Sequence, residues 1–114
     1  MKYFKPSEFS DFDKMDKTLL SMLDDTREEL GLPISLNSSY RSPEHPIEAA
    51  KDKPGEHTYG AAVDVKSQGG EYTFKLVKAA IKVGFTRIGI NRKKNFVHLG
   101  IGYSGAAPVS IWTY

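Results

Sequence analysis

One acidic residue stands in a segment that otherwise has the pattern of a buried β-strand. Asp64 lies between Val63 and Val65 in the segment 60–65. A buried carboxylate is strongly unfavourable unless it is paired, hydrogen-bonded or bound to a metal ion. Successive side chains of a strand alternate between its two faces, so Asp64 and Ala62 share the face opposite the two valines. The alternation therefore predicts that Asp64 points away from the main core.

Two histidines are placed so that they can reach the same face. His98 lies in the segment 96–101, and if this strand pairs with that of Asp64, both side chains project to one side. His57 comes shortly before Asp64, and Gly60 permits a tight turn that brings His57 back over the same spot. Two imidazoles and a carboxylate fill three positions of a tetrahedral zinc ion and leave the fourth for water, which is typical of catalytic zinc. An ordinary hydrogen bond between histidine and aspartate is the alternative.

Arg41 is a further candidate, at the end of one predicted strand and the start of a loop. Its planar guanidinium suits a substrate carboxylate. A surface arginine or a structural salt bridge is the alternative interpretation. The following stretch, 43–56, is rich in proline and surrounds a short helical turn expected at 47–50. Such loops are where a scaffold commonly carries its functional side chains.

Composition limits the class of protein. The 114 residues have a formal charge of +2, 39% hydrophobic and 26% charged residues, and no cysteine. These values are typical of one folded domain, which we expect to span residues 1–114. They exclude disulfides and a cysteine nucleophile. We expect no nucleic acid partner, because the charges are nearly balanced, and no membrane span, because no apolar run approaches about 20 residues.

Two helices are expected to support these residues. The first opens at Ser10 or Asp11 and continues to Leu30, with apolar residues at helical spacing and Gly31 at its end. The second runs from about 71 to 83 and ends at a glycine.

The remaining segments predict a small sheet. Strands are expected at 34–38, 60–65, 87–90 and 96–101, and the last two form a hairpin. The tail reads as an edge strand or a lid, with Trp112 anchored in the core rather than serving as a sugar platform. Together the elements predict an α+β fold, in which helices pack on one face of a mostly antiparallel sheet.

Three segments together resemble the M15 zinc peptidases, the family of D-alanyl-D-alanine carboxypeptidases and phage endolysins that shares its fold with hedgehog domains. Residues 38–43, Ser-Ser-Tyr-Arg-Ser-Pro, resemble the family segment S-G-Y-R-S-P. Residues 55–64 resemble the motif S-x-H-x-x-G-x-A-x-D, and residues 96–98 resemble the strand that bears the last ligand. The order and spacing of these segments agree with the family pattern across residues 34–101.

The resemblance implies a site and a function. His57, Asp64 and His98 would hold Zn²⁺, and Arg41 would bind the substrate's carboxylate or polarise its carbonyl. The substrate would be a peptidoglycan stem peptide, cut at D-Ala–D-Ala or at an L-Ala to D-Glu type bond. We expect a monomer, made in the cytoplasm without a signal peptide, that acts on the cell wall after release or as a virion-associated protein.

The chain departs from the family pattern where a general acid/base is expected. Relatives commonly place an acidic residue three positions before the last ligand, or a histidine two before it. Here these positions are Asn95 and Phe96, neither of which accepts a proton from water. Gly100 and Gly55 likewise replace an Asp and a Ser that relatives carry.

Glu44, His45 and Glu56 are the nearby substitutes, although Glu56 would point away from His57 in an extended segment. The missing base leaves two alternatives to a peptidase. One is a zinc-bearing module that binds a peptide or partner and has lost hydrolysis. The other is a phage structural component.

Overall fold

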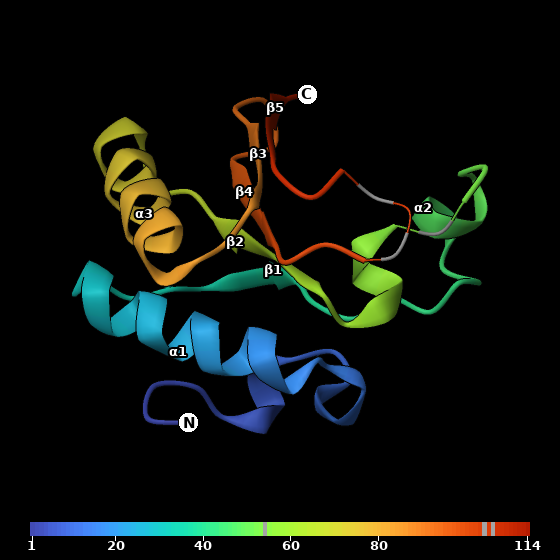
Figure 1. The fold of residues 1–114 in the computed structure, drawn as a ribbon, viewed down its shortest axis with the longest axis horizontal. Helices are drawn as coiled ribbons and strands as arrows, with labels where there is room; N and C mark the ends of the chain where they lie inside the picture. The colour runs from blue at the N-terminus through green and yellow to red at the C-terminus, as the bar shows by residue number, and fades with distance from the viewer. Residues whose placement is uncertain (54, 104, 106) are drawn as a thin grey trace.

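The computed structural model, which describes residues 1–53, 55–103, 105 and 107–114, is built around one five-stranded sheet (Figure 1). Its strands are β1 (Leu36–Ser38), β2 (Ala62–Lys66), β3 (Arg87–Asn91), β4 (Phe96–Gly100) and β5 (Ser110–Thr113), in the order β1-β2-β4-β3-β5. All neighbours are antiparallel except β3 and β5, which are parallel. The predicted α+β class, the hairpin and the tail as an edge strand are confirmed.

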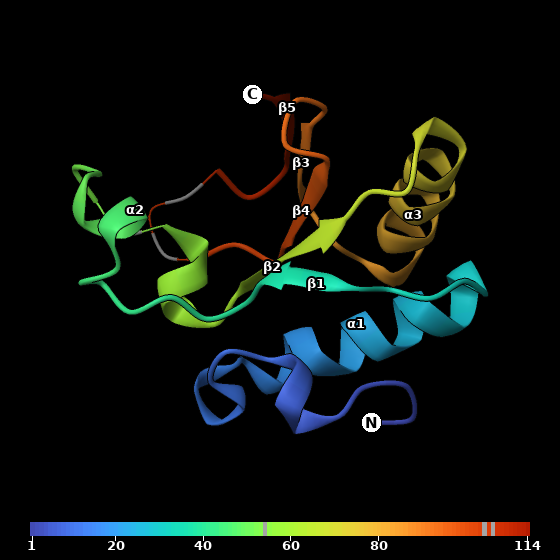
Figure 2. The same ribbon diagram turned by 180° about the vertical axis from the view of Figure 1, so that it is seen from behind.

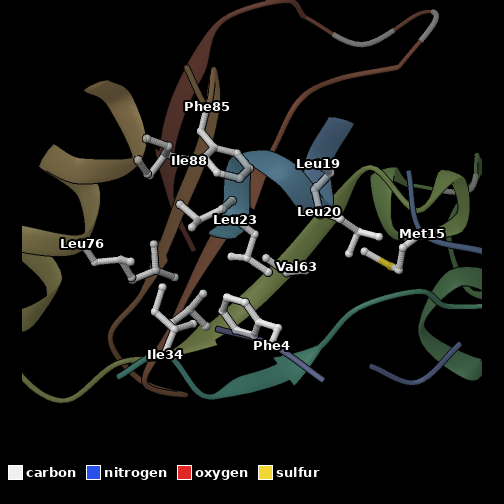
Figure 3. Packing of buried hydrophobic residues seen from close by; sticks show 14 of the residues in the cluster. Phe4, Met15, Leu19, Leu20, Leu23, Ile34, Val63, Leu76, Phe85 and Ile88 are labelled. Carbon is white, nitrogen blue, oxygen red and sulfur yellow. The ribbon is translucent and has the colours of Figure 1, made fainter. Parts of the chain in front are cut away.

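Two long helices cover one face of the sheet. α1 (Lys17–Leu30) and α3 (Gly70–Val83) pack against each other and against the sheet (Figure 2). Figure 3 shows the apolar side chains that fill the space between these layers. The largest fully buried members of this cluster come from both helices and from β2 and β4: Leu19, Leu23, Leu76, Val63, Val65, Val97 and Leu99. The valines flanking Asp64 therefore face the core, as the alternation predicts.

The other face of the sheet is bordered by short elements. α2 (Pro46–Ala49) and the 3-10 turn η3 (Glu56–Tyr59) lie at the end of the long axis opposite α3 (Figure 1). Neither element contributes to the main apolar cluster. No helix among the described residues is both long and apolar enough to cross a membrane.

The first helix begins later than the sequence pattern predicts. A 3-10 turn spans Phe12–Lys14, Met15 is extended, and α1 opens at Lys17 with Asp16 as its N-cap. The Asp16 carboxylate accepts the Leu19 amide at 3.0 Å. The prediction was wrong because a tertiary contact interrupts the helix: the Asp16 backbone N–H donates to the carbonyl of Gly60 at 3.0 Å.

Gly60 joins this N-terminal segment to the turn that carries His57. It ends η3 in the left-handed conformation, with φ of 64°. A Cβ at this position would lie 2.2 Å from the backbone oxygen of Lys14. Both the backbone angle and the close approach therefore require glycine here.

A pair of glycine substitutions separates these two requirements. Gly31 ends α1 with φ of 70° but has nothing within 4 Å of its Cβ position. We expect Gly31→Ala to lower the free energy of unfolding by about 1–2 kcal/mol from backbone strain alone. Gly60→Ala should cost about 3 kcal/mol or more, because the backbone of Lys14 must also move. Urea unfolding measures both values, and equal losses in the two variants would contradict this role of Gly60.

Candidate metal centre

Strand pairing places Asp64 directly opposite His98. The two residues are register partners in the antiparallel pair β2–β4, and both are buried. His57 reaches them from η3, and its Nε2 lies 3.3 Å from Asp64 Oδ1. His98 Nδ1 approaches the same oxygen to 3.2 Å, and the three ligand atoms all lie within 4.8 Å of one another. The three residues singled out in the sequence therefore converge in the fold.

The chemistry of this cluster fits a cation. Within the described part of the chain, Asp64 Oδ1 is the one buried side-chain nitrogen or oxygen without a hydrogen-bond partner. A buried carboxylate oxygen left unpaired is strongly unfavourable. A positive ion between Oδ1 and the two ring nitrogens would satisfy it.

Hydrogen bonds on the outer side of each ring leave the inner nitrogens free. His57 Nδ1 lies 2.7 Å from the carbonyl oxygen of Ser39 and must donate to it, which leaves Nε2 with a lone pair. His98 Nε2 lies 2.8 Å from Glu56 Oε1 and donates to that carboxylate, so that Nδ1 carries the lone pair when the ring is neutral. Outer contacts of this kind fix the tautomer of metal-binding histidines. Both lone pairs face Asp64.

Arg41 holds the second oxygen of the same carboxylate. Its Nη2 lies 3.3 Å from Asp64 Oδ2, its Nη1 donates to Glu48 at 2.9 Å, and its Nε donates to Ser38 at 3.1 Å. Glu48 is itself buried and also accepts from Lys51 and from the backbone N–H of Gly55. The chain of contacts from α2 to β2 orients Asp64 so that only Oδ1 faces the histidines.

The charges of the cluster shift its protonation equilibria. Burial alone would raise the pKa of Asp64, but the His57 and His98 imidazoles outweigh it and hold this pKa well below its usual value. Burial would likewise raise the pKa of Glu56, but His98 and Arg87 together outweigh this effect and lower it. The pKa of His98 is raised, because the Asp64 and Glu56 carboxylates outweigh the effect of burial. Asp64 is therefore ionised, and a cation bound there takes the place of a proton on His98.

The cluster forms the floor of a cavity of about 510 Å³. Its walls are aromatic and its rim is basic. The aromatic residues are Phe96, Tyr103, Trp112 and Tyr114, and the lysines are Lys51, Lys53 and Lys94. Such a cavity suits a short ligand with apolar groups and negative charge.

Trp112 is not a core residue, contrary to the sequence-based expectation. It is half-buried and lines this cavity, with its ring centroid 5.1 Å from that of His98. Its register partner is Gly89, and a Cβ there would lie 2.6 Å from the indole. A glycine inside a strand often marks such a close approach, so Gly89 was a readable signal.

Glu56 also differs from its expected orientation. The segment is a 3-10 turn rather than extended, so Glu56 and His57 both turn inward and are buried. Glu44 and His45 are exposed and lie outside the cavity, and His45 instead accepts the amide of Ile47. Asn95 occupies the turn before β4, with φ of 55°, and does not line the cavity.

Glu48 was missed at the sequence level. It is one of four acidic residues in the loop-rich stretch 43–56, and nothing in its spacing indicates burial. Its partners Arg41 and Gly55 are each seven residues away along the chain. Both lie outside the four-residue helix α2 that carries Glu48, so a helical or strand pattern could not relate them to it.

A protein-family model described as Peptidase M15 matches residues 5–100. This span contains Arg41, His57, Asp64 and His98. No curated protein matches the chain. Because the match covers most of its length, the chain belongs to the M15 peptidase family. Membership of this family and the His/Asp cluster indicate a peptidase with a site able to bind a metal ion.

The ion pair of Glu48 with Arg41 makes stability depend on pH. Burial opposes ionisation of Glu48, but the Gly55 amide, Arg41 and Lys51 outweigh it and lower its pKa from 4.5 to about 2. A lowered pKa in the folded state stabilises the fold above the unfolded value of 4.5 and loses this contribution as the pH falls toward 2.

We therefore expect Glu48→Gln to lower the free energy of unfolding by about 2–3 kcal/mol at pH 7. The difference from wild type should shrink between pH 5 and pH 2, as measured by urea unfolding at each pH. Glu28→Gln, which removes a mostly exposed pair with Lys2, is the control and should change little. A pH-independent loss in Glu48→Gln would contradict the assignment.

Proposed function

We propose that this chain is a zinc-dependent metallopeptidase that hydrolyses an amide bond of peptidoglycan stem peptides, either as a D-Ala-D-Ala carboxypeptidase or as an endolysin-type endopeptidase. The observation that carries the proposal is the unpaired Asp64 Oδ1, faced by ring nitrogens of His57 and His98 at 3.3 and 3.2 Å. Its setting supports the same function, since the cluster lies at the floor of an open cavity in an M15 family domain.

The donor set favours zinc among common metals. Two imidazole nitrogens and one carboxylate oxygen are borderline ligands that suit Zn²⁺, whereas Mg²⁺ and Ca²⁺ favour oxygen ligands alone. His57, Asp64 and His98 would supply three ligands and leave a position open to the cavity. When bound, zinc would lower the pKa of a coordinated water toward about 7 and polarise a carbonyl.

Arg41 would orient both the site and the substrate. Three of its five N–H groups bond to Ser38, Glu48 and Asp64, and its side chain still borders the cavity at 14% exposure. The remaining N–H groups are available to a carboxylate or carbonyl of the substrate. Lys53 and Lys94 on the rim add positive charge that attracts the acidic stem peptide.

A second candidate function is a zinc-bearing binding module without hydrolysis. It is favoured by the state of the acidic groups in the cavity. Glu56 accepts from His98, Arg87 and the Gly102 amide, so its oxygens are engaged by three donors. Asn95 and Phe96 take no proton. Among the described residues, the cavity therefore offers no free carboxylate as a general base, whose contribution is commonly about 10²–10⁴-fold.

Zinc binding and peptide cleavage can be measured on matched histidine variants. We expect wild type to bind one zinc ion, and His57→Ala to lose affinity by more than 100-fold, since a ligand matters more than the outer contacts typically worth about 10–100-fold. His45→Ala should bind like wild type, because His45 is exposed and outside the cavity. Titration calorimetry measures the affinity, and release of D-Ala or soluble muropeptides measures cleavage.

The outcomes separate the two candidates. Cleavage by wild type and His45→Ala, lost in His57→Ala, supports the peptidase. Zinc binding without cleavage of either substrate supports the binding module. Absence of zinc binding in wild type would reject both.

A further inference from the structure

Glu56 lines the cavity, and its carboxylate is fixed by three hydrogen bonds. It is 3% exposed. Its Oε1 accepts from His98 Nε2 at 2.8 Å and from Arg87 Nε at 2.8 Å, and its Oε2 accepts the backbone N–H of Gly102 at 2.9 Å. Donors from β3, β4 and the segment after β4 therefore fix the position and rotation of this one carboxylate.

The carboxylate occupies space that strand β4 leaves open. A Cβ on Gly100 would lie 2.2 Å from Glu56 Oε2 and 2.6 Å from its Cδ. Real Cβ atoms do not approach other atoms so closely, so any other residue at position 100 would displace the carboxylate. Gly100 is needed here for space, in the interior of a sheet where glycine is otherwise unfavourable.

The contact decides which nitrogen of His98 carries its proton. Neutral imidazole has one N–H and one lone pair. With the proton on Nε2, held by Glu56, the Nδ1 lone pair faces Asp64 Oδ1 at 3.2 Å. Without Glu56, the proton can move to Nδ1 and donate to Asp64 Oδ1. That internal hydrogen bond would satisfy the unpaired oxygen and compete with a cation.

We propose that Glu56 is the positioning residue that holds His98 in the ion-binding tautomer, and that Gly100 is the residue that makes room for it. The proposal rests on the metal site of the proposed function. A carboxylate on the outer nitrogen of a ligating histidine also raises the basicity of the inner one. Glu56 would therefore orient His98 for metal binding and would not itself transfer a proton.

The tautomer can be read in the metal-free protein. In ¹⁵N imidazole spectra recorded at a pH high enough for His98 to be neutral, the wild-type ring should carry its proton on Nε2, and Glu56→Ala should shift His98 toward the Nδ1–H form. The tautomer of His57, fixed by the Ser39 carbonyl, should stay unchanged. This measurement needs no metal, so it tests Glu56 even if wild type binds no zinc and the proposed function fails.

Zinc affinity gives a second readout, through calorimetry and through the fluorescence of Trp112, the single tryptophan, beside His98. Glu56→Ala should bind zinc about 10–100-fold more weakly. Gly100→Ala should weaken binding in the wild-type background, because its Cβ displaces Glu56, but should have little effect when combined with Glu56→Ala. The double variant Glu56→Ala/Gly100→Asp returns a carboxylate to the same space and should recover most of the affinity.

Circular dichroism confirms which variants fold. Should Glu56→Ala not fold, Glu56→Gln keeps the side-chain shape while turning one acceptor into a donor, and should give a several-fold loss of affinity. The proposal is overturned if the folded Glu56 variants keep the Nε2–H tautomer and wild-type affinity. It is also overturned if Gly100→Ala has the same effect with and without Glu56.

Discussion

The cost of burying the Asp64 carboxylate is the constraint on which the rest of the site depends. One of its oxygens has a partner in Arg41, whereas the other faces two imidazole lone pairs and has no hydrogen bond. Glu48 and Glu56 are also buried, and Arg41, Arg87 and Lys51 face the three acids. With neutral histidines these charges balance, so a divalent ion bound there adds net positive charge to the cavity. A positively charged floor favours an anionic ligand, such as a peptide carboxylate.

The sheet arranges this chemistry through one row of register partners. Asp64 on β2 pairs with His98 on β4, which pairs with Gly89 on β3, which pairs with Trp112 on β5. Gly89 leaves room for the indole beside His98, and Gly100 leaves room for the Glu56 carboxylate. Two glycines in neighbouring strands thus leave space where a side chain would stand, and Trp112 and Glu56 fill it. Neither glycine has a positive φ, so each is needed for the space that a missing side chain leaves and not for its backbone conformation.

Much of the fold follows from local pattern. Alternation correctly assigned Asp64 to the face opposite Val63 and Val65. Helical spacing predicted α1, although with too early a start, and nearly all of α3. The errors have one physical origin. The first helix starts late because the Asp16 amide bonds to Gly60. Trp112 leaves the core because its pairing opposite Gly89 places it on the face of the sheet that carries His98. In each case a contact between distant segments overrode the local preference.

By itself, the sequence determined the face on which Asp64 and His98 lie, because side-chain direction in a strand follows from a period of two. It also determined the family, through the spacing of its motifs. Only the tertiary structure decided which ring nitrogens turn inward, where Arg41 finds its partners and that Glu56 lies against Gly100. Most of these contacts join residues 18 to 46 positions apart. The exceptions are the contacts of Arg41 with Ser38 and Glu48, which are three and seven residues away. No local periodicity reaches so far, since such contacts exist only once the sheet has set its register.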